Sequence, residues 1–120
     1  MQNWAAPGFE FNPTAMNAYL EAMRADESIR SSCEDYRAGA GVDAEHDLAD
    51  WQAGNKVICP LLFLWGAKRS FGGPQGAKNP LAIWQQWCSA NVIGGPLDCG
   101  HFLPEEAPEE LTQQLLAFLA

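Results

Sequence analysis

The feature that most constrains the fold is the run Val57–Gly66 (VICPLLFLWG), which has no charged side chain and no polar–apolar alternation. A strand with one face in water alternates apolar and polar residues, whereas a strand inside a parallel sheet is apolar throughout. Pro60 lies near the start of the run, where a strand tolerates the missing N–H. The run therefore predicts a buried strand over 61–65 that needs cover on both faces.

Helix and strand signals on either side of this run predict the order of elements. Before it we expect three helices: one from Pro13 after an Asn12 cap, one over 26–39, and one over 43–54 with Leu48 and Trp51 facing inward. After it, Asn79-Pro80 begins a helix, Val92–Leu97 forms a short strand and Pro108 opens a last helix. This order indicates an α/β fold with parallel strands. Two strands do not make a stable sheet, so we expect the end of a larger α/β protein.

Charge and composition exclude several classes of protein. The 120 residues carry 15 acidic and 7 basic side chains, a net charge of −8, which disfavours binding to nucleic acid. No apolar stretch is long enough to span a bilayer, and no signal peptide follows Met1, so we expect a cytoplasmic protein. The four cysteines are widely and irregularly spaced, which favours free thiols over a disulfide framework.

Most candidate chemistry in the sequence has a simpler explanation. No serine has the flanking glycines of a nucleophile elbow, and no phosphate-binding loop motif is present in Gly72–Lys78. The cluster Asp43, Glu45, His46 and Asp47 is better explained by solvated helix acids than by a metal site, so we expect no metal and no cofactor. His101 is different, because it follows a short strand and Gly100 and precedes an amphipathic helix.

Three segments carry a resemblance to a known family. Cys99–Pro108 (CGHFLPEEAP) resembles the catalytic-histidine segment of α/β-hydrolases. Cys33–Gly39 (CEDYRAG) and Pro60–Gly66 (PLLFLWG) resemble the matching segments of the haloacetate (fluoroacetate) dehalogenase branch. The order and spacing agree from about Asn12 onward, and the cysteine-to-glycine segment is the one that points to this branch.

The resemblance implies a fold and a division of the chain. Members of the family are well over twice as long as this chain. By resemblance, residues 1–54 are the end of the helical cap and its return to the core, and residues 55–120 are the C-terminal part of the hydrolase core with its last two strands.

The resemblance also implies a mechanism and two site residues. In the family an aspartate displaces halide to form an ester, and a histidine oriented by a second acid activates the water that hydrolyses it. His101 matches that histidine. Tyr36 matches a cap tyrosine that donates a hydrogen bond to the leaving halide, although from its position beside Ile29 and Cys33 it is equally explained as a packed core tyrosine. The nucleophile is expected outside the chain. Many α/β-hydrolases carry the orienting acid just after the strand that matches Leu61–Trp65, but residues 52–97 contain no Asp or Glu. The dehalogenase branch takes this acid from an earlier strand, so the resemblance implies that it also lies outside the chain.

The resulting hypothesis is a hydrolase that cleaves the carbon–halogen bond of a small halogenated short-chain acid, with this chain inactive alone and prone to self-association. An epoxide hydrolase, which also uses an aspartate nucleophile and cap tyrosines, is the alternative within enzymes. A non-catalytic remnant or interaction fragment is the alternative outside them.

Overall fold

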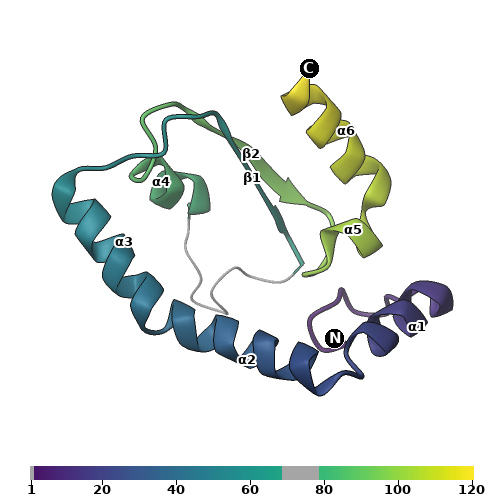
Figure 1. Ribbon diagram of the computed structural model, residues 1–120. Helices are drawn as coiled ribbons and strands as arrows, with labels where there is room; N and C mark the ends of the chain where they lie inside the picture. Colours follow the sequence, from purple (N-terminus) through teal and green to yellow (C-terminus); the bar gives the residue numbers. More distant parts are fainter. Residues whose placement is uncertain (1, 69–78) are drawn as a thin grey trace. The chain divides into compact units, whose positions relative to one another are not determined.

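The computed structural model describes residues 2–68 and 79–120, which form two compact units (Figure 1). One unit, the strand unit, contains Met1–Glu10 and Val57–Ala120, and the other, the helical unit, contains Phe11–Lys56. The predicted division near residue 54 lies close to this boundary. The sequence did not indicate that the first ten residues group with the strands. The assignment of the two parts to a cap and a core stays a prediction.

The helical unit consists of three helices whose ends follow the predicted signals. They are α1 (Pro13–Ala22), α2 (Asp26–Gly39) and α3 (Val42–Ala53). The Asn12 side chain accepts hydrogen bonds from the N–H groups of Thr14 and Ala15 at 2.8 and 3.3 Å, as expected of an N-cap. Gly54 ends α3 in the left-handed conformation, with a φ of 73°.

No residue of the helical unit is buried. The expectation that Leu48 and Trp51 face inward is therefore wrong for this chain, because their side chains are 56% and 43% exposed. The helical period was interpreted correctly, but an apolar face is buried only where another element covers it.

In the residues that the structure describes, the strand unit has two parallel strands and three helices. In chain order these are β1 (Leu61–Gly66), α4 (Pro80–Gln85), β2 (Val92–Leu97), α5 (Leu103–Glu106) and α6 (Pro108–Leu119). The register pairs Leu61 with Val92 and Gly66 with Leu97, so the two strands end together. The predicted α/β order is confirmed, and the short α5 is an element that the sequence did not indicate.

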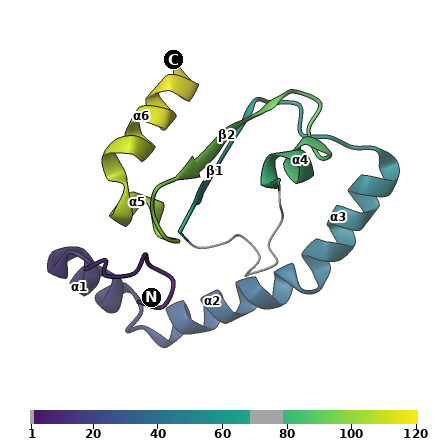
Figure 2. The same cartoon turned by 180° about the vertical axis from the view of Figure 1, so that it is seen from behind.

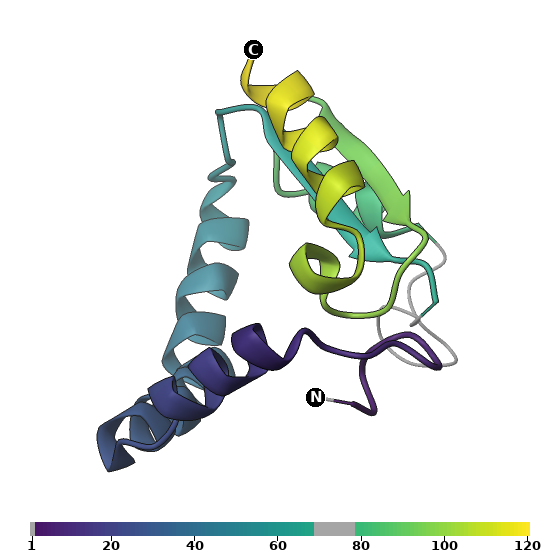
Figure 3. The same ribbon diagram turned by 90° about the vertical axis from the view of Figure 1, so that its right-hand side faces the viewer.

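Helices α4 and α6 lie on opposite faces of the strand pair (Figures 2 and 3). On one face the Phe63 ring lies 5.5 Å from the Trp84 ring of α4. On the other, Leu62 and Leu64 line a groove with Phe118 of α6. These two helices cover the strands only in part. The expected full burial of 61–65 is therefore not observed: these residues are half-buried, and Gly66 alone in the strand is buried.

Candidate active-site loop

The residues that follow β2 form a short loop, 98–102, at the carboxyl end of the strand pair. Leu97, Cys99 and Gly100 are buried, whereas His101 is exposed. In open α/β sheets, ligands bind outside the carboxyl ends of the strands. The loop therefore presents the His101 imidazole at the edge where such a fold carries its chemistry.

The end of β1 holds one side of this loop. The N–H groups of Ala67 and Lys68 donate to the carbonyls of Leu97 and Cys99 at 2.8 and 2.9 Å. The Lys68 ammonium donates to the Asp98 carbonyl at 3.1 Å and lies 3.2 Å from the Asp98 carboxylate. These hydrogen bonds between the end of β1 and the residues after β2 fix the direction in which the loop leaves the sheet.

The approach of the loop to β1 requires glycine at position 66. A Cβ placed on Gly66 would lie 1.6 Å from the carbonyl oxygen of Gly100. Gly100 is equally confined, because a Cβ there would lie 2.2 Å from the Ala6 nitrogen. No side chain fits between these backbones, so both positions exclude every residue except glycine.

A carboxylate from α5 holds the other side of the loop. Glu106 Oε2 accepts hydrogen bonds from the N–H groups of Gly100 and Ala6 at 2.7 and 2.8 Å, and Oε1 accepts one from Phe102 at 3.0 Å. Partial burial alone raises the pKa of Glu106, but the three N–H donors and the positive charge of Lys68 outweigh it and hold the pKa below its usual value. The side chain is therefore ionised at neutral pH.

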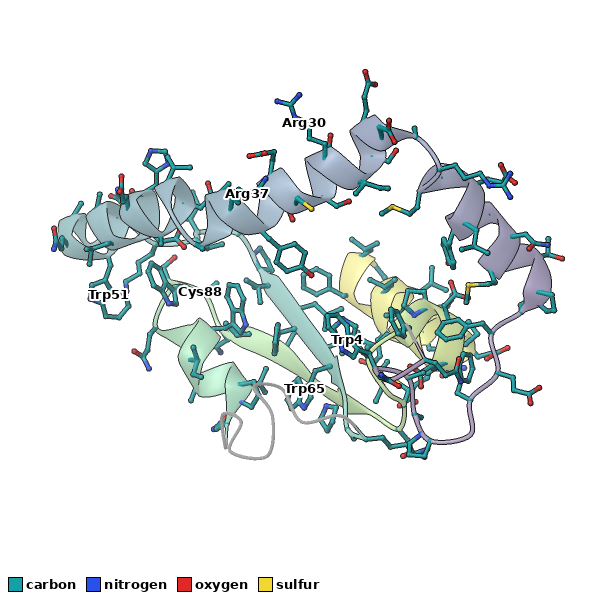
Figure 4. All side chains as sticks on the ribbon, turned by 90° about the horizontal axis from the view of Figure 1, so that it is seen from below. Trp4, Arg30, Arg37, Trp51, Trp65 and Cys88 are labelled. Atoms are coloured by element: carbon teal, nitrogen blue, oxygen red, sulfur yellow. The ribbon has the colours of Figure 1, made fainter. Side chains whose placement is uncertain are left out.

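The segment before α1 also contacts the histidine. The backbone N–H of His101 donates to the carbonyl of Trp4, which is labelled in Figure 4, at 2.9 Å. The Trp4 ring meets the imidazole edge-on at 4.9 Å between centroids. Phe102 makes a second edge-on contact with the imidazole at 5.2 Å. Two aromatic rings thus limit the orientations of an otherwise exposed imidazole.

Within residues 2–68 and 79–120, no carboxylate is hydrogen-bonded to a nitrogen of the His101 ring. The two glutamates of α5 follow His101 closely in sequence, but Glu106 is directed to backbone N–H groups. The part of the chain that the structure describes therefore supplies a possible general base without the acid that would orient it. That the orienting acid lies outside this chain stays a prediction.

Tyr36 belongs to the helical unit and lies on the third turn of α2. Its side chain is 73% exposed, and Ile29 and Cys33 on the same helical face are exposed as well. Tyr36 is therefore not a packed core residue of this unit, and its hydroxyl is accessible. On the same helix, the side chains of Glu34 and Arg37 form an ion pair with each other.

The cysteines and the acidic cluster add no further chemistry to the loop. All four cysteines are free, Cys33 and Cys59 exposed and Cys88 and Cys99 buried. Burial, and then the charges of Glu106 and Glu110, raise the pKa of the Cys99 thiol, so it is protonated and a poor nucleophile at neutral pH. In the described residues no group of three or more His, Cys, Asp or Glu side chains is placed to hold a metal ion. No helix in those ranges is long and apolar enough to cross a membrane.

Two residues that shape the loop were missed by sequence reasoning. Glu106 lies inside the segment that resembles the catalytic-histidine region, but nothing in that pattern says which of Glu105 and Glu106 turns back to the backbone. Trp4 is almost a hundred residues away from His101, and no motif surrounds it. Both roles depend on contacts between distant segments, which a single sequence does not display.

Two curated proteins are similar to this chain in sequence. A fluoroacetate dehalogenase from Burkholderia sp. is 33% identical over 121 aligned residues, covering 98% of this chain and 37% of that protein. A soluble epoxide hydrolase from Corynebacterium sp. strain C12 is 33% identical over 111 residues, covering 92% of this chain and 35% of that protein. The chain thus spans little more than a third of the length of the curated relatives it matches. No family model matches it.

Solved structures agree on the fold. A protein from Nostoc sp. PCC 7120 described as an α/β-hydrolase superposes with a TM-score of 0.83 and 41% identity, over 99% of this chain and 39% of its own. A Pseudomonas aeruginosa protein described as an epoxide hydrolase superposes with a TM-score of 0.82 and 39% identity, over 95% of this chain and 37% of its own. The architecture defines the C-terminal part of an α/β-hydrolase fold. The chain belongs to the α/β-hydrolase superfamily.

Proposed function

We propose that this chain is the histidine-bearing part of a hydrolase that cleaves the carbon–halogen bond of a small halogenated acid. The observation that carries the proposal is the exposed His101 imidazole on a loop held from both sides at the carboxyl ends of two parallel strands. The similarity to a fluoroacetate dehalogenase over 98% of the chain supports the same reading.

The proposed reaction has two steps. An aspartate supplied from outside this chain attacks the carbon that bears the halogen; a carbon–oxygen bond forms as the halide leaves with the bonding electrons. His101 then takes a proton from water as the water oxygen attacks the ester carbonyl, which releases the hydroxy acid and restores the carboxylate. General-base assistance of this kind contributes roughly 10²–10⁴-fold to a rate. Neither step requires a metal or a cofactor.

Tyr36 is proposed to assist the first step. Its exposed hydroxyl can donate a hydrogen bond, and a donor to the departing halide strengthens as negative charge builds on the halogen. This role rests on the resemblance of Cys33–Gly39 to the cap segment of haloacetate dehalogenases.

Epoxide hydrolysis is the second candidate. The Corynebacterium epoxide hydrolase is as similar to this chain as the dehalogenase, at 33% identity, and both reactions use an ester intermediate by resemblance. The two functions differ in the first step, because an epoxide opens to an alkoxide that must be protonated, whereas a halide simply departs. A non-catalytic interaction fragment is the candidate outside enzymes.

A chimera tests the proposal directly. This chain replaces the aligned third of the Burkholderia fluoroacetate dehalogenase, so that the rest of that protein supplies what the resemblance places outside the chain. We expect halide release from fluoroacetate and chloroacetate and no diol from styrene oxide. Diol formation without halide release would establish the epoxide reaction instead. A folded chimera without either activity would support the non-catalytic alternative.

A further inference from the structure

Three consecutive backbone N–H groups around the histidine have a defined acceptor. Gly100 and Phe102 donate to Glu106 at 2.7 and 3.0 Å, and His101 between them donates to the Trp4 carbonyl at 2.9 Å. A loop of this length usually leaves some of its N–H groups to water, which allows several backbone conformations. Here the backbone on both sides of His101 is fixed, while the imidazole remains exposed.

The Glu106 side chain also joins the loop to the start of the chain. The oxygen that accepts from Gly100 accepts from Ala6 as well, at 2.8 Å, and the carbonyl of Trp4 is two residues away from that donor. One carboxylate therefore connects the loop to the segment whose Trp4 ring meets the imidazole. The confined position of Gly100, where a Cβ would lie 2.7 Å from Glu106 Oε2, shows how closely the carboxylate fits against the backbone.

Only a carboxylate of this length satisfies all three donors. Both oxygens of an ionised carboxylate accept hydrogen bonds and neither donates. A glutamine in the same place turns its NH₂ group toward at least one backbone N–H, and the best orientation keeps the bonds to Gly100 and Ala6 while opposing Phe102. An aspartate keeps the charge but draws the oxygens back by one methylene group.

We propose that Glu106 is a positioning residue for His101, which fixes the backbone on both sides of the histidine and couples it to the Trp4 segment. The inference deepens the proposed function and rests on it for its catalytic consequence. Glu106 touches backbone N–H groups and not the imidazole, so its effect on catalysis is transmitted through His101. The proposal predicts that the water-activating step depends on Glu106 and that the halide-releasing step does not.

The first test uses the 120-residue chain and needs no activity. Hydrogen–deuterium exchange is measured by mass spectrometry in Glu106→Gln, with Glu109→Gln as the matched control, because Glu109 is an exposed acid of α6 and undergoes the same change of charge. We expect exchange at residues 100–102 to become roughly tenfold faster in Glu106→Gln, as for the loss of one charge-assisted hydrogen bond. Exchange in α6 should stay unchanged, as should all exchange in the control. Unchanged exchange at 100–102 would overturn the proposal.

The second test separates positioning from loss of stability. In the chimera, single-turnover measurements follow halide release and ester hydrolysis separately for Glu106→Gln and Glu106→Asp. We expect roughly tenfold slower ester hydrolysis with unchanged halide release, so that the ester accumulates. Equal slowing of both steps, or no slowing, would show that Glu106 only supports the fold. Should Glu106→Gln fail to fold, Glu106→Asp decides the question. Ester hydrolysis at the parent rate in Glu106→Asp would show that the length of the Glu106 side chain does not matter and would contradict the proposal.

The two tests also separate this proposal from the proposed function. A parent chimera that never forms an ester contradicts the proposed function and leaves the exchange result to decide whether Glu106 orders the loop. A parent chimera that forms and hydrolyses the ester at rates insensitive to Glu106 supports the function and contradicts the positioning role.

Discussion

The two units of this chain are stabilised in different ways. In the helical unit the helix ends follow local signals such as the Asn12 cap and the left-handed Gly54, and no side chain is buried. In the strand unit, the buried residues Ala5, Cys88 and Cys99 come from segments far apart in sequence. His101, the candidate general base, belongs to the strand unit, and Tyr36, the candidate halide contact, belongs to the helical unit.

This difference indicates which of the two candidate residues is held in place by contacts within its own unit. Around His101 the contacts run between β1, α5 and the segment before α1, so the loop has its conformation within this unit alone. Isolated helices of 10–14 residues are marginal in water when their apolar faces are uncovered. The helical unit therefore presents Tyr36 but does not by itself restrict it.

Two glycine substitutions should give effects of opposite sign in the two units. Gly66→Ala places a Cβ against the Gly100 carbonyl, so we expect a destabilisation of at least about 3 kcal/mol, the upper end of the usual range for overpacking. Gly39→Ala meets nothing within 4 Å at the end of α2 and should stabilise that helix by up to about 1 kcal/mol. Urea unfolding followed by circular dichroism measures both. An unchanged free energy of unfolding in Gly66→Ala would contradict the close packing of the loop against β1.

Tyr36→Phe should change catalysis without changing stability. The ring of an exposed tyrosine contributes little to packing, so the melting temperature should stay the same. In the chimera the halide-releasing step should slow by somewhat less than the roughly 10²–10³-fold seen for loss of one oxyanion donor, and most for fluoride. A lower melting temperature with an unchanged single-turnover rate on fluoroacetate would make Tyr36 a structural residue.

Acid should loosen the strand unit through Glu106. The pKa of this carboxyl is lower in the folded chain than in the unfolded chain, so its contribution is fully present above about pH 4.5 and is lost as the pH falls through the folded value. Glu106→Gln should remove this part of the pH dependence, while Glu109→Gln should keep it. Urea midpoints measured between neutral pH and pH 3 test this, and parallel profiles for the parent chain and Glu106→Gln would contradict it.

The chain alone should self-associate weakly. Large apolar side chains are exposed in both units, including Leu48 in α3 and Ile58, Leu116 and Leu119 in the strand unit. Exposed apolar surface and unpaired strand edges favour association. Sedimentation velocity at several concentrations should show a rising average mass, whereas a single monomeric species with a sharp cooperative melt would count against the expectation.

The sequence predicted the positions of helices and strands better than the burial of their side chains. Asn12-Pro13, Asn79-Pro80 and Gly54 are local signals, and each marks a helix end in the structure. The parallel pairing of 61–66 with 92–97 followed from the order of elements. The predicted burial of Trp51 and the full burial of 61–65 are not observed. Burial depends on which element covers a face, and the residues of that face do not indicate the covering element.

The site was predictable in part for the same reason. His101 could be proposed from the sequence because the residues on either side of it, from Cys99 to Pro108, carry the resemblance. The hydrogen bonds from Ala6 and Gly100 to Glu106 join residues up to a hundred positions apart, and the contact of Trp4 with the imidazole spans a similar interval. Such contacts arise only when the fold brings the segments together.

The central claim is that His101 activates the water that hydrolyses an ester intermediate, and the intact mass of the chimera carrying His101→Gln tests it most directly. Halide displacement needs no general base, so after exposure to fluoroacetate this variant should release one equivalent of fluoride and retain one carboxymethyl group on the protein. The parent chimera should show no lasting mass increase, because it hydrolyses the ester. A His101→Gln chimera that stays unmodified and continues to release fluoride would show that another residue is the base.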